Sequence, residues 1–521
     1  MSAEIEQLPE PSLLFANGCK VSDPHIGLSL FGPFDEGADS KPSTISYALI
    51  GTETGIAAFQ RMAARMQSLI LPPSISPIEN VGETTMDSGG DGDDETVADN
   101  RLWPAFPGFF TAFNSTFPTT TKFQYAIPAP TIEEFAHDKD QHKRVYQLVG
   151  LYLDQIAKIA ERDERINVIL CVIPDIIWLN CRPLSVVRNG ATGESVGKKE
   201  ALLRQQYGDL FGEFPVDQYD WSNDFRRQIK ARSMEHGIPI QLIRESTLVF
   251  DDSSGNRSLT PLSDRAWNLS TALYYKACGK PWKLADAREG VCYIGLAFRR
   301  EEGAKDNSRT ACCAAQMFLD SGDGVVFRGE FGPWYSPKEH EFHLSRTEAK
   351  NLLSGVIDTY CAQGGKTLRE VFLHSRSGFD ENELAGYQDA CPEGVKLVGV
   401  VVSGRDSGLR LFRKGKRCVQ RGLLWIHSPR LAYLWSSGFK KDLLTYDGSE
   451  VPVPLTIRVQ FGEADIRQVC KDIFALTKLN YNACKVGDSD PVTVKFSDNV
   501  GEILTSNRFI KERKPQFRFY I

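Results

Sequence analysis

Two basic residues spaced four apart, Arg226 and Lys230, could bind a phosphate group. On a helix such residues are neighbours, and like charges at that spacing repel by roughly 0.2–0.5 kcal/mol, which a bound anion would relieve. Gln241 follows on the next predicted strand, and Lys276 lies in the last turn of the next long predicted helix. Charged and amide donors together suit a phosphate, although a solvated basic helix face would carry the same pair.

The first half of the chain, which positions these residues, alternates between helix and strand. Apolar periodicity predicts helices and strands in the order 145–161 (helix), 166–173 (strand), 223–235 (helix), 238–243 (strand) and 264–278 (helix). Gly237 and Gly279 follow two of the helices, at positions where glycine commonly ends a helix. This alternation favours a parallel sheet with helices on its faces. A nucleotide-binding Rossmann enzyme is disfavoured, because no G-x-G-x-x-G follows a strand and the phosphate-loop lookalike at 193–199 has the wrong spacing.

The second half has a different order of elements. Its pattern predicts strands at 291–298, 310–319 and 324–331, a helix opened by a capping pair, then a strand at 370–374, a helix at 380–390 and a strand at 395–402. The capping pair is Ser345 and Glu348. Three strands followed by helix, strand, helix and strand is the order of the ribonuclease H fold. We therefore expect an α/β protein whose Rossmann-like first half precedes a ribonuclease H-like second half.

The positions that would carry cleavage chemistry in such a core lack acids. Two-metal phosphodiester cleavage needs several carboxylates around a pair of Mg²⁺ ions, which lie about 4 Å apart. The expected positions, midway along the first strand and at the end of the fourth, are Ala297 and Ser375. Glu330 is the one strand-end carboxylate left, and His374 has no evident acid or nucleophile partner. The sequence therefore predicts a core that binds a duplex and leaves it intact.

Composition agrees with a globular protein of two or three domains. Apolar residues make up 41% and charged residues 25% of the 521 residues, and the net charge of −6 argues against a protein that coats nucleic acid in bulk. The acidic, low-complexity segment at about 72–100 predicts a disordered insertion. The cysteines form no C-x-x-C pair and no apolar run is long enough for a membrane span, so we expect a reduced, cytoplasmic setting with no membrane partner.

Several longer runs give a resemblance to a known family. They read FRRQIKAR (225–232), RESTL (244–248), YKACGKPWKL (275–284), ACCAAQMFLD (311–320), NYNAC (480–484) and the ending FYI. These runs resemble those of short prokaryotic Argonautes, which consist of MID and PIWI domains, and are most similar to the Argonaute subunit of SPARTA immune systems. The likeness extends from about Pro11 to the last residue. It implies a MID unit within 1–287 and an inactive PIWI domain at 288–521.

The resemblance also implies roles for individual residues. The family's MID pocket holds the 5′-phosphate of the guide, which here maps to Arg226, Lys230, Gln241 and Lys276. The C-terminal carboxylate, here that of Ile521, would reach the pocket through a bound Mg²⁺ shared with Gln241. Many Argonautes have tyrosine or histidine where this chain has Arg226, so the first base would lose a stacking ring, although a guanidinium can also stack.

The family further implies a guide RNA, a single-stranded DNA target and an obligate TIR-APAZ partner. Target binding would assemble such heterodimers into higher-order oligomers, in which the TIR domains degrade NAD as a defence against viruses and plasmids. This chain would then be no enzyme. An active guide-directed nuclease and a scaffold without nucleic acid remain alternatives. Basic residues that could line a duplex channel are Arg405, Arg410, Arg413, Lys414, Lys416, Arg417 and Arg421, and Arg508, Lys511, Arg513 and Lys514 near the end.

Overall fold

A computed structural model gives the arrangement of most of the chain. It describes residues 4–72, 103–183, 185–187, 194–195, 222–250, 259–300, 311–318, 324–332, 335–336, 341–362, 367–404, 408–415, 417–446, 448, 450–507 and 513–521. The predicted acidic insertion lies almost wholly outside these ranges. Within them, no helix combines the length and the apolar character that crossing a membrane requires.

The first half contains a four-stranded sheet in which every pair of neighbours is parallel. Its order is β5 (Gln124–Ala126), β4 (Tyr47–Gly51), β6 (Val168–Ile173) and β9 (Ile240–Arg244). The helices around it are α2 (Glu53–Arg65), α4 (Ala129–Ala136), α5 (Gln141–Ala160), α6 (Asp175–Asn180), α8 (Phe225–Ser233) and α9 (Leu262–Lys276). All six residues of β6 are buried, as a strand covered on both faces requires. The predicted parallel sheet is confirmed.

Alternate residues of β4 show how the helices divide between the two faces. Tyr47 and Leu49 pack with Phe59 of α2, whereas Ala48 and Ile50 pack with the apolar side of α5. Successive side chains of a strand point to opposite faces, so both faces of the sheet are covered. Smaller elements complete this half. A three-stranded sheet contains β2 (Leu13–Leu14), β3 (Lys20–Val21) and β10 (Lys283–Leu284), and a two-stranded one pairs β7 (Ser185–Val186) with β8 (Glu194–Ser195). Two short helices, α1 (Pro24–Leu30) and α3 (Phe109–Phe113), lie nearby.

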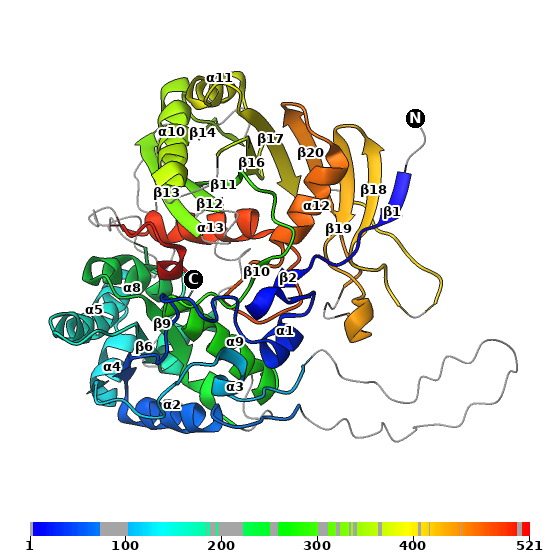
Figure 1. The fold of residues 1–521 in the computed structure, drawn as a ribbon. Coiled ribbons are helices and arrows are strands. Elements are labelled where there is room, and N and C mark those ends of the chain that lie inside the picture. The colour runs from blue at the N-terminus through cyan, green and yellow to red at the C-terminus, as the bar shows by residue number, and fades with distance from the viewer. Residues whose placement is uncertain are drawn as a thin grey trace, which may run out of the picture.

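The second half is built on a nine-stranded sheet, drawn in the upper part of Figure 1. Five strands run in the order β13 (Gly324–Gly332), β12 (Ala311–Phe318), β11 (Val291–Arg300), β16 (Glu370–Ser375) and β17 (Lys396–Ser403). β12 is antiparallel to both neighbours, and β11, β16 and β17 are parallel. This is the predicted ribonuclease H arrangement. The sheet continues antiparallel through β20 (Leu455–Phe461), β19 (Leu431–Trp435), β18 (Leu423–Ser428) and β1 (Glu4–Gln7). A separate hairpin pairs β14 (Tyr335–Ser336) with β15 (Glu341–Phe342).

Helices cover the two faces of this sheet in different places. α10 (Arg346–Ala362) and α11 (Glu381–Ala390) pack on the face that carries Ile294, Leu296 and Leu373. α12 (Ile466–Leu476) and α13 (Val492–Leu504) lie on the opposite face. Any side chain at Gly295 would collide with backbone atoms of Thr493, so the start of α13 rests directly on β11. That close contact fixes α13 against the centre of the core.

The N-terminal segment belongs to both halves. β1 pairs antiparallel with β18 at the edge of the nine-stranded sheet. Just after it, Glu10 accepts hydrogen bonds from Arg421 (Nε to Oε2, 3.0 Å) and from Lys478 (Nζ to Oε1, 2.8 Å), and the two cationic side chains are almost fully buried. Arg421 had been predicted to line a duplex channel. That prediction is wrong, because its guanidinium is enclosed by Glu10, Thr477 and backbone oxygens.

The two halves also meet between α8 and α13. The side chain of Gln228 donates to the backbone oxygen of Ser506 (2.6 Å) and accepts from Asn507 (3.2 Å). Arg227 forms an ion pair with Glu502 at 3.2 Å. The helix that carries the predicted phosphate-binding pair is therefore held by the helix that packs on the centre of the ribonuclease H-like core.

The end of α9 differs from the sequence prediction. The residue in the left-handed conformation is Cys278 (φ 75°), one position before Gly279. Backbone bonds from Cys278 N to Tyr275 O (3.1 Å) and from Gly279 N to Tyr274 O (2.9 Å) form a Schellman motif around it. Gly279 is needed instead for space, since a Cβ there would overlap the ring of Tyr274.

Candidate nucleic-acid interface

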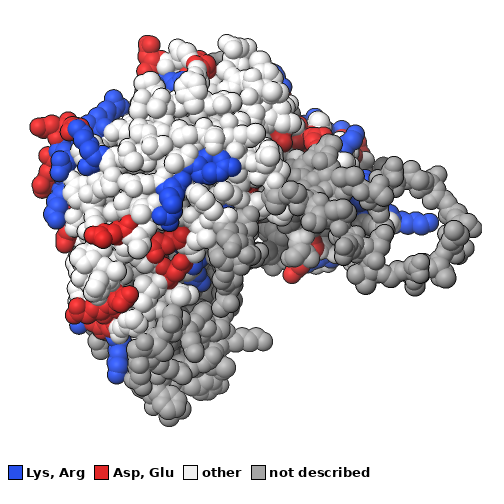
Figure 2. Space-filling view, turned by 90° about the horizontal axis from the view of Figure 1, so that it is seen from below, with Lys and Arg blue, Asp and Glu red and all other residues white. Residues whose placement is uncertain are grey.

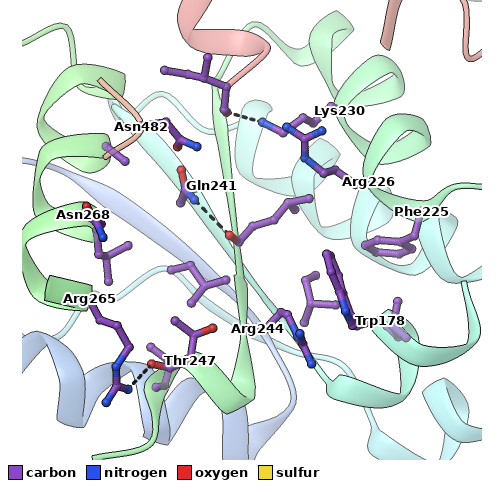
Figure 3. Close-up of a pocket in the computed structure, with 18 of the residues that line it drawn as sticks. Trp178, Phe225, Arg226, Lys230, Gln241, Arg244, Thr247, Arg265, Asn268 and Asn482 are labelled. Carbon is purple, nitrogen blue, oxygen red and sulfur yellow. Dashed lines mark hydrogen bonds between the residues drawn. The ribbon is translucent and has the colours of Figure 1, made fainter. Parts of the chain in front are cut away.

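A cavity of about 750 Å³ opens at the carboxyl ends of β6 and β9 (Figure 3). It is bounded by α6, α8 and α9, and by Asn482 and Ile521 from the second half. Ligands of open parallel sheets bind at this end of the strands, where loops and helix ends converge. Three of the predicted phosphate ligands, Arg226, Lys230 and Gln241, line the cavity.

Two buried lysines meet at one oxygen beside this cavity. Lys230 of α8 and Lys276 of α9 are 3% and 0% exposed, and the ammonium groups of both donate to the main-chain oxygen of Ile521, the last residue of the sequence. Lys276 also donates to the backbone oxygen of Arg518 (3.2 Å). The structure therefore brings together every residue predicted for the phosphate site, although Lys276 stands behind the Ile521 oxygen and does not line the cavity itself.

The positive charges in this cluster destabilise one another. Burial lowers the pKa of Lys230 well below its usual value, and the charges of Lys276 and Arg226 lower it further. Burial, followed by the charge of Arg226, lowers the pKa of Lys276 to about 7. Burial also lowers the pKa of Arg226, against the opposing influence of Asp224 and Glu502. An anion bound here would restore the charge of both lysines, because an opposite charge nearby favours the protonated form.

Gln241 presents an unsatisfied polar atom to the site. Its Nε2 donates to the backbone oxygen of Leu242 (3.1 Å), and its Oε1 is buried without a hydrogen-bond partner. A buried amide oxygen left unpaired costs free energy that a bound cation or donor would recover. Mg²⁺ prefers oxygen ligands of this kind, so Gln241 fits the predicted metal. The Ile521 oxygen fits it less directly, because it already accepts from two ammonium groups.

An aromatic wall of the cavity was not predicted from the sequence. Two guanidinium groups approach the ring of Trp178 of α6: Cζ of Arg182 is 4.2 Å and Cζ of Arg244 is 4.7 Å from the ring centroid. Arg244 is held by Asp175 (Nε to Oδ1, 2.9 Å). The side chains point into the same cavity as Arg226 (Figure 3). The available signal was the position of Trp178 just after the buried strand β6, at the end of the sheet where ligands bind.

The structure does not bring Ala297 and Ser375 together. In the parallel register Gly295 lies beside His374, so Ala297 shares a face with His374, whereas Ser375 points to the opposite face. Ala297 is 4% exposed and pairs with Ala314. The hydroxyl of Ser375 lies 3.3 Å from that of Ser377, which follows the end of the strand. An acid at Ser375 would therefore not face one at Ala297.

His374 is a structural residue. Its Nδ1 lies 2.9 Å from Oγ1 of Thr493 at the start of α13, and burial lowers its pKa to about 3, so the ring is neutral. Two acids remain relevant to this core, Glu330 in β13 and Asp498 in α13, and the second was not considered from the sequence. Their side chains lie outside the described part of the structure. Among the described residues, no group of three or more His, Cys, Asp or Glu side chains could hold a metal ion.

The charged surface agrees with the absence of a global basic field. On the face seen from below in Figure 2, basic and acidic side chains form small, separate groups among uncharged ones. Of the predicted channel residues that the structure describes, Arg410, Arg413, Lys414 and Arg417 are exposed. Arg405, Lys416, Arg508 and Lys511 lie outside the described residues.

Comparisons with known proteins identify structures of similar fold but no similar sequence. No family model and no curated protein sequence matches the chain. Among solved structures, Clostridium butyricum Argonaute bound to a guide DNA and a 19-mer target DNA superposes with a TM-score of 0.63 at 14% identity, over 100% of this chain and 55% of that one. Aquifex aeolicus Argonaute superposes with a TM-score of 0.56 at 13% identity, over 100% of this chain and 57% of that one. Drosophila Piwi superposes with a TM-score of 0.53 at 12% identity, over 99% of this chain and 56% of that one. The fold of this chain is thus that of the Argonaute proteins, over slightly more than half of their length.

Proposed function

We propose that this chain binds a guide strand by its phosphorylated 5′ end and presents it for pairing with a target strand. The observation that carries the proposal is the convergence of Lys230 and Lys276 on one oxygen, beside Arg226, in a cavity at the carboxyl ends of β6 and β9. Two buried ammonium groups with lowered pKa values and an adjacent guanidinium match the charge of a terminal phosphate.

In the proposed complex each group has a distinct role. Arg226 and Lys230 would contact the phosphate oxygens, and Lys276 would support them from behind the Ile521 oxygen. Gln241 Oε1 and the carboxylate of Ile521 would hold the predicted Mg²⁺ ion, which would supply positive charge beside the phosphate. The unpaired state of that amide oxygen supports this assignment.

The proposal further assigns no cleavage to this chain. It rests on Ala297, which stands in β11 where an acid is expected, and on neutral, buried His374, the residue of β16 that shares the face of Ala297. By its resemblance to SPARTA subunits, the chain would take a guide RNA, recognise single-stranded DNA in the cytoplasm and work with a TIR-APAZ partner. In oligomers of that heterodimer the partner would degrade NAD as an immune response.

An active guide-directed nuclease is the second candidate, because Glu330 and Asp498 leave two acids in the core. One experiment addresses both functions. Purified protein is mixed with 5′-phosphorylated or 5′-hydroxyl RNA, and binding is measured for wild type and Lys230→Ala. Labelled complementary DNA and Mg²⁺ are then added. The proposal expects a preference for the 5′-phosphate that Lys230→Ala removes, and an intact target. Equal binding of both RNAs would overturn the guide pocket, and a guide-dependent product would establish the nuclease.

A further inference from the structure

The outer part of the nine-stranded sheet has a face that carries partly exposed aromatic side chains. Ile5 of β1, Trp425 of β18, Tyr433 of β19 and Thr456 of β20 lie directly opposite one another in consecutive strands. Directly opposed residues share a face, so these four form one row across the sheet. α12 packs against the other face of these strands, where Arg467 pairs with Glu4 and Glu6 of β1 (Figure 1).

The row is partly accessible to solvent. Ile5 is 65% exposed, and Trp425, Tyr433 and Thr456 are partly exposed. The rings of Trp425 and Tyr433 stack with centroids 5.1 Å apart and an interplanar angle of 29°. A nucleobase can extend such a stack beyond Tyr433, because every base has a π face of similar size. The small side chain of Thr456 leaves room beside Tyr433.

The charge on this face is suited to phosphate. The positions on β18, β19 and β20 that share the face with the row are apolar, uncharged or basic, and they include exposed Arg458 and His427. Arg430, between β18 and β19, is exposed too, and its guanidinium donates to the backbone oxygens of Val459, Gln460 and Gly462.

A second group of basic residues lies in the chain segment that precedes β18, whereas Arg430 follows β18. Four exposed basic residues lie in the segment that leads into β18, namely Arg410, Arg413, Lys414 and Arg417. Glu4 and Glu6, the acids on either side of Ile5 in β1, alternate with it and point to the α12 face. Aromatic rings between two sets of cations are the combination that binds unpaired nucleic acid.

We propose that this face of β1, β18 and β19 is a docking surface for a single strand of nucleic acid, whose bases stack on Trp425 and Tyr433 while its phosphates contact Arg458 and the basic segment. The site is separate from the cavity at β6 and β9 and does not depend on it. A polypeptide would also cover aromatic rings, but the flanking cations favour a polyanion.

The test measures binding of a fluorescent 12-residue oligo-dT with a 5′-hydroxyl end, which cannot use a phosphate pocket, to the full chain by anisotropy. Trp425→Ala and Tyr433→Leu should each weaken binding roughly five- to 150-fold, the range that corresponds to stacking of about 1–3 kcal/mol per base. Arg458→Gln should weaken binding and lower the salt slope by roughly one. The matched control is Tyr146→Ala, which removes an exposed aromatic ring from α5 in the other half and should leave binding unchanged.

Two further readouts keep the outcome clear. Thermal melts by circular dichroism identify any variant that fails to fold, and Tyr433→Leu then carries the test if Trp425→Ala is unstable. The preference for 5′-phosphate over 5′-hydroxyl RNA should be unchanged in Trp425→Ala and lost in Lys230→Ala, so failure of one site is distinguishable from failure of the other. Unchanged oligo-dT binding in both folded ring variants would overturn the proposal. If these variants instead bound oligo-dT unchanged and lost a protein that co-purifies with the wild type, the face would be a binding surface for a polypeptide, and the proposal would again be overturned.

Discussion

The lowered pKa of Lys276 should make the proposed binding of a guide strand sensitive to pH. In the guide-free protein this pKa is about 7, because the ammonium is buried and faces the charge of Arg226. A bound phosphate stabilises the protonated form, so binding above pH 7 must take up a proton. Changing the pH alone therefore changes the charge of Lys276, without any substitution. Affinity for a 5′-phosphorylated RNA should therefore fall as the pH rises from 7 to 9.

The magnitude follows from the fraction of Lys276 that carries a proton. That fraction is about one half at pH 7 and about one hundredth at pH 9 for a pKa of about 7. Affinity should then fall about 50-fold, which corresponds to about 2.3 kcal/mol. Lys230 also has a lowered pKa, so this value is the effect expected for a single proton. The phosphate contributes little, because its second pKa is near 6 and it is already dianionic.

The assay is a titration of labelled 5′-phosphorylated RNA at pH 7, 8 and 9 and constant ionic strength. The same RNA with a 5′-hydroxyl end is the control, since it shares every base titration and lacks the anion. Lys276→Gln should bind more weakly and lose much of the pH slope. An equal slope for both RNAs would refute the reasoning, because the proton would then have no link to the phosphate.

The same lysine predicts the pH dependence of stability. The folded pKa of Lys276 is lowered from 10.5 to about 7, so the unfolded chain binds more protons between those values. The guide-free protein should therefore become more stable as the pH rises through this window. Thermal melts of wild type against Lys276→Gln measure this contribution, and identical pH profiles of the two proteins would contradict the assigned pKa.

Three further predictions concern the guide pocket, the N-terminal ion pair and the activity of the chain alone. Arg226→Ala and Lys230→Ala should each weaken binding of 5′-phosphorylated RNA by about 1–3 kcal/mol, the scale of a charge-assisted hydrogen bond, with little change for 5′-hydroxyl RNA. Unchanged affinity for the phosphorylated RNA in both variants would refute the assignment of the phosphate pocket. Glu10→Gln should lower the unfolding free energy by about 3–5 kcal/mol, because it leaves Arg421 and Lys478 buried without their carboxylate, and a melting temperature within one degree of wild type would contradict this. The purified chain should neither cut a guide-paired DNA nor degrade NAD, and chromatography of both substrates after incubation checks it.

Much of the fold could be predicted because the apolar periodicity is strong. The buried run of β6 and the apolar face of α10 give the types of their elements with little competition from other patterns. The convergence of the residues predicted to bind phosphate could also be predicted, since a basic pair on a helix and an amide on the next strand meet at the end of a parallel sheet. Lys276 was placed correctly at the end of α9, although its position behind Ile521 was not foreseen.

The remaining features depend on contacts between distant segments. Pairing of β1 with β18 joins the first residues to a strand far along the chain, and no local pattern encodes it. Enclosure of Arg421 depends on the same contact, through Glu10. The face on which Ser375 lies depends on the register between β11 and β16, and a shift of one residue would reverse it. The left-handed Cys278 was missed because the adjacent Gly279 offered the more common solution.

The path of the N-terminal segment determines how this protein can be divided for study. A fragment that begins at residue 288 would contain most of the nine-stranded sheet, but it would leave the hydrogen-bonding edge of β18 open. It would also leave the ammonium of Lys478 without Glu10 and without the backbone oxygen of Ser22, the two groups to which it donates. Exposed strand edges recruit other strands, so such a fragment should aggregate. Co-expression with a peptide spanning residues 4–22 should restore its solubility, because that peptide supplies both the missing strand and the missing carboxylate.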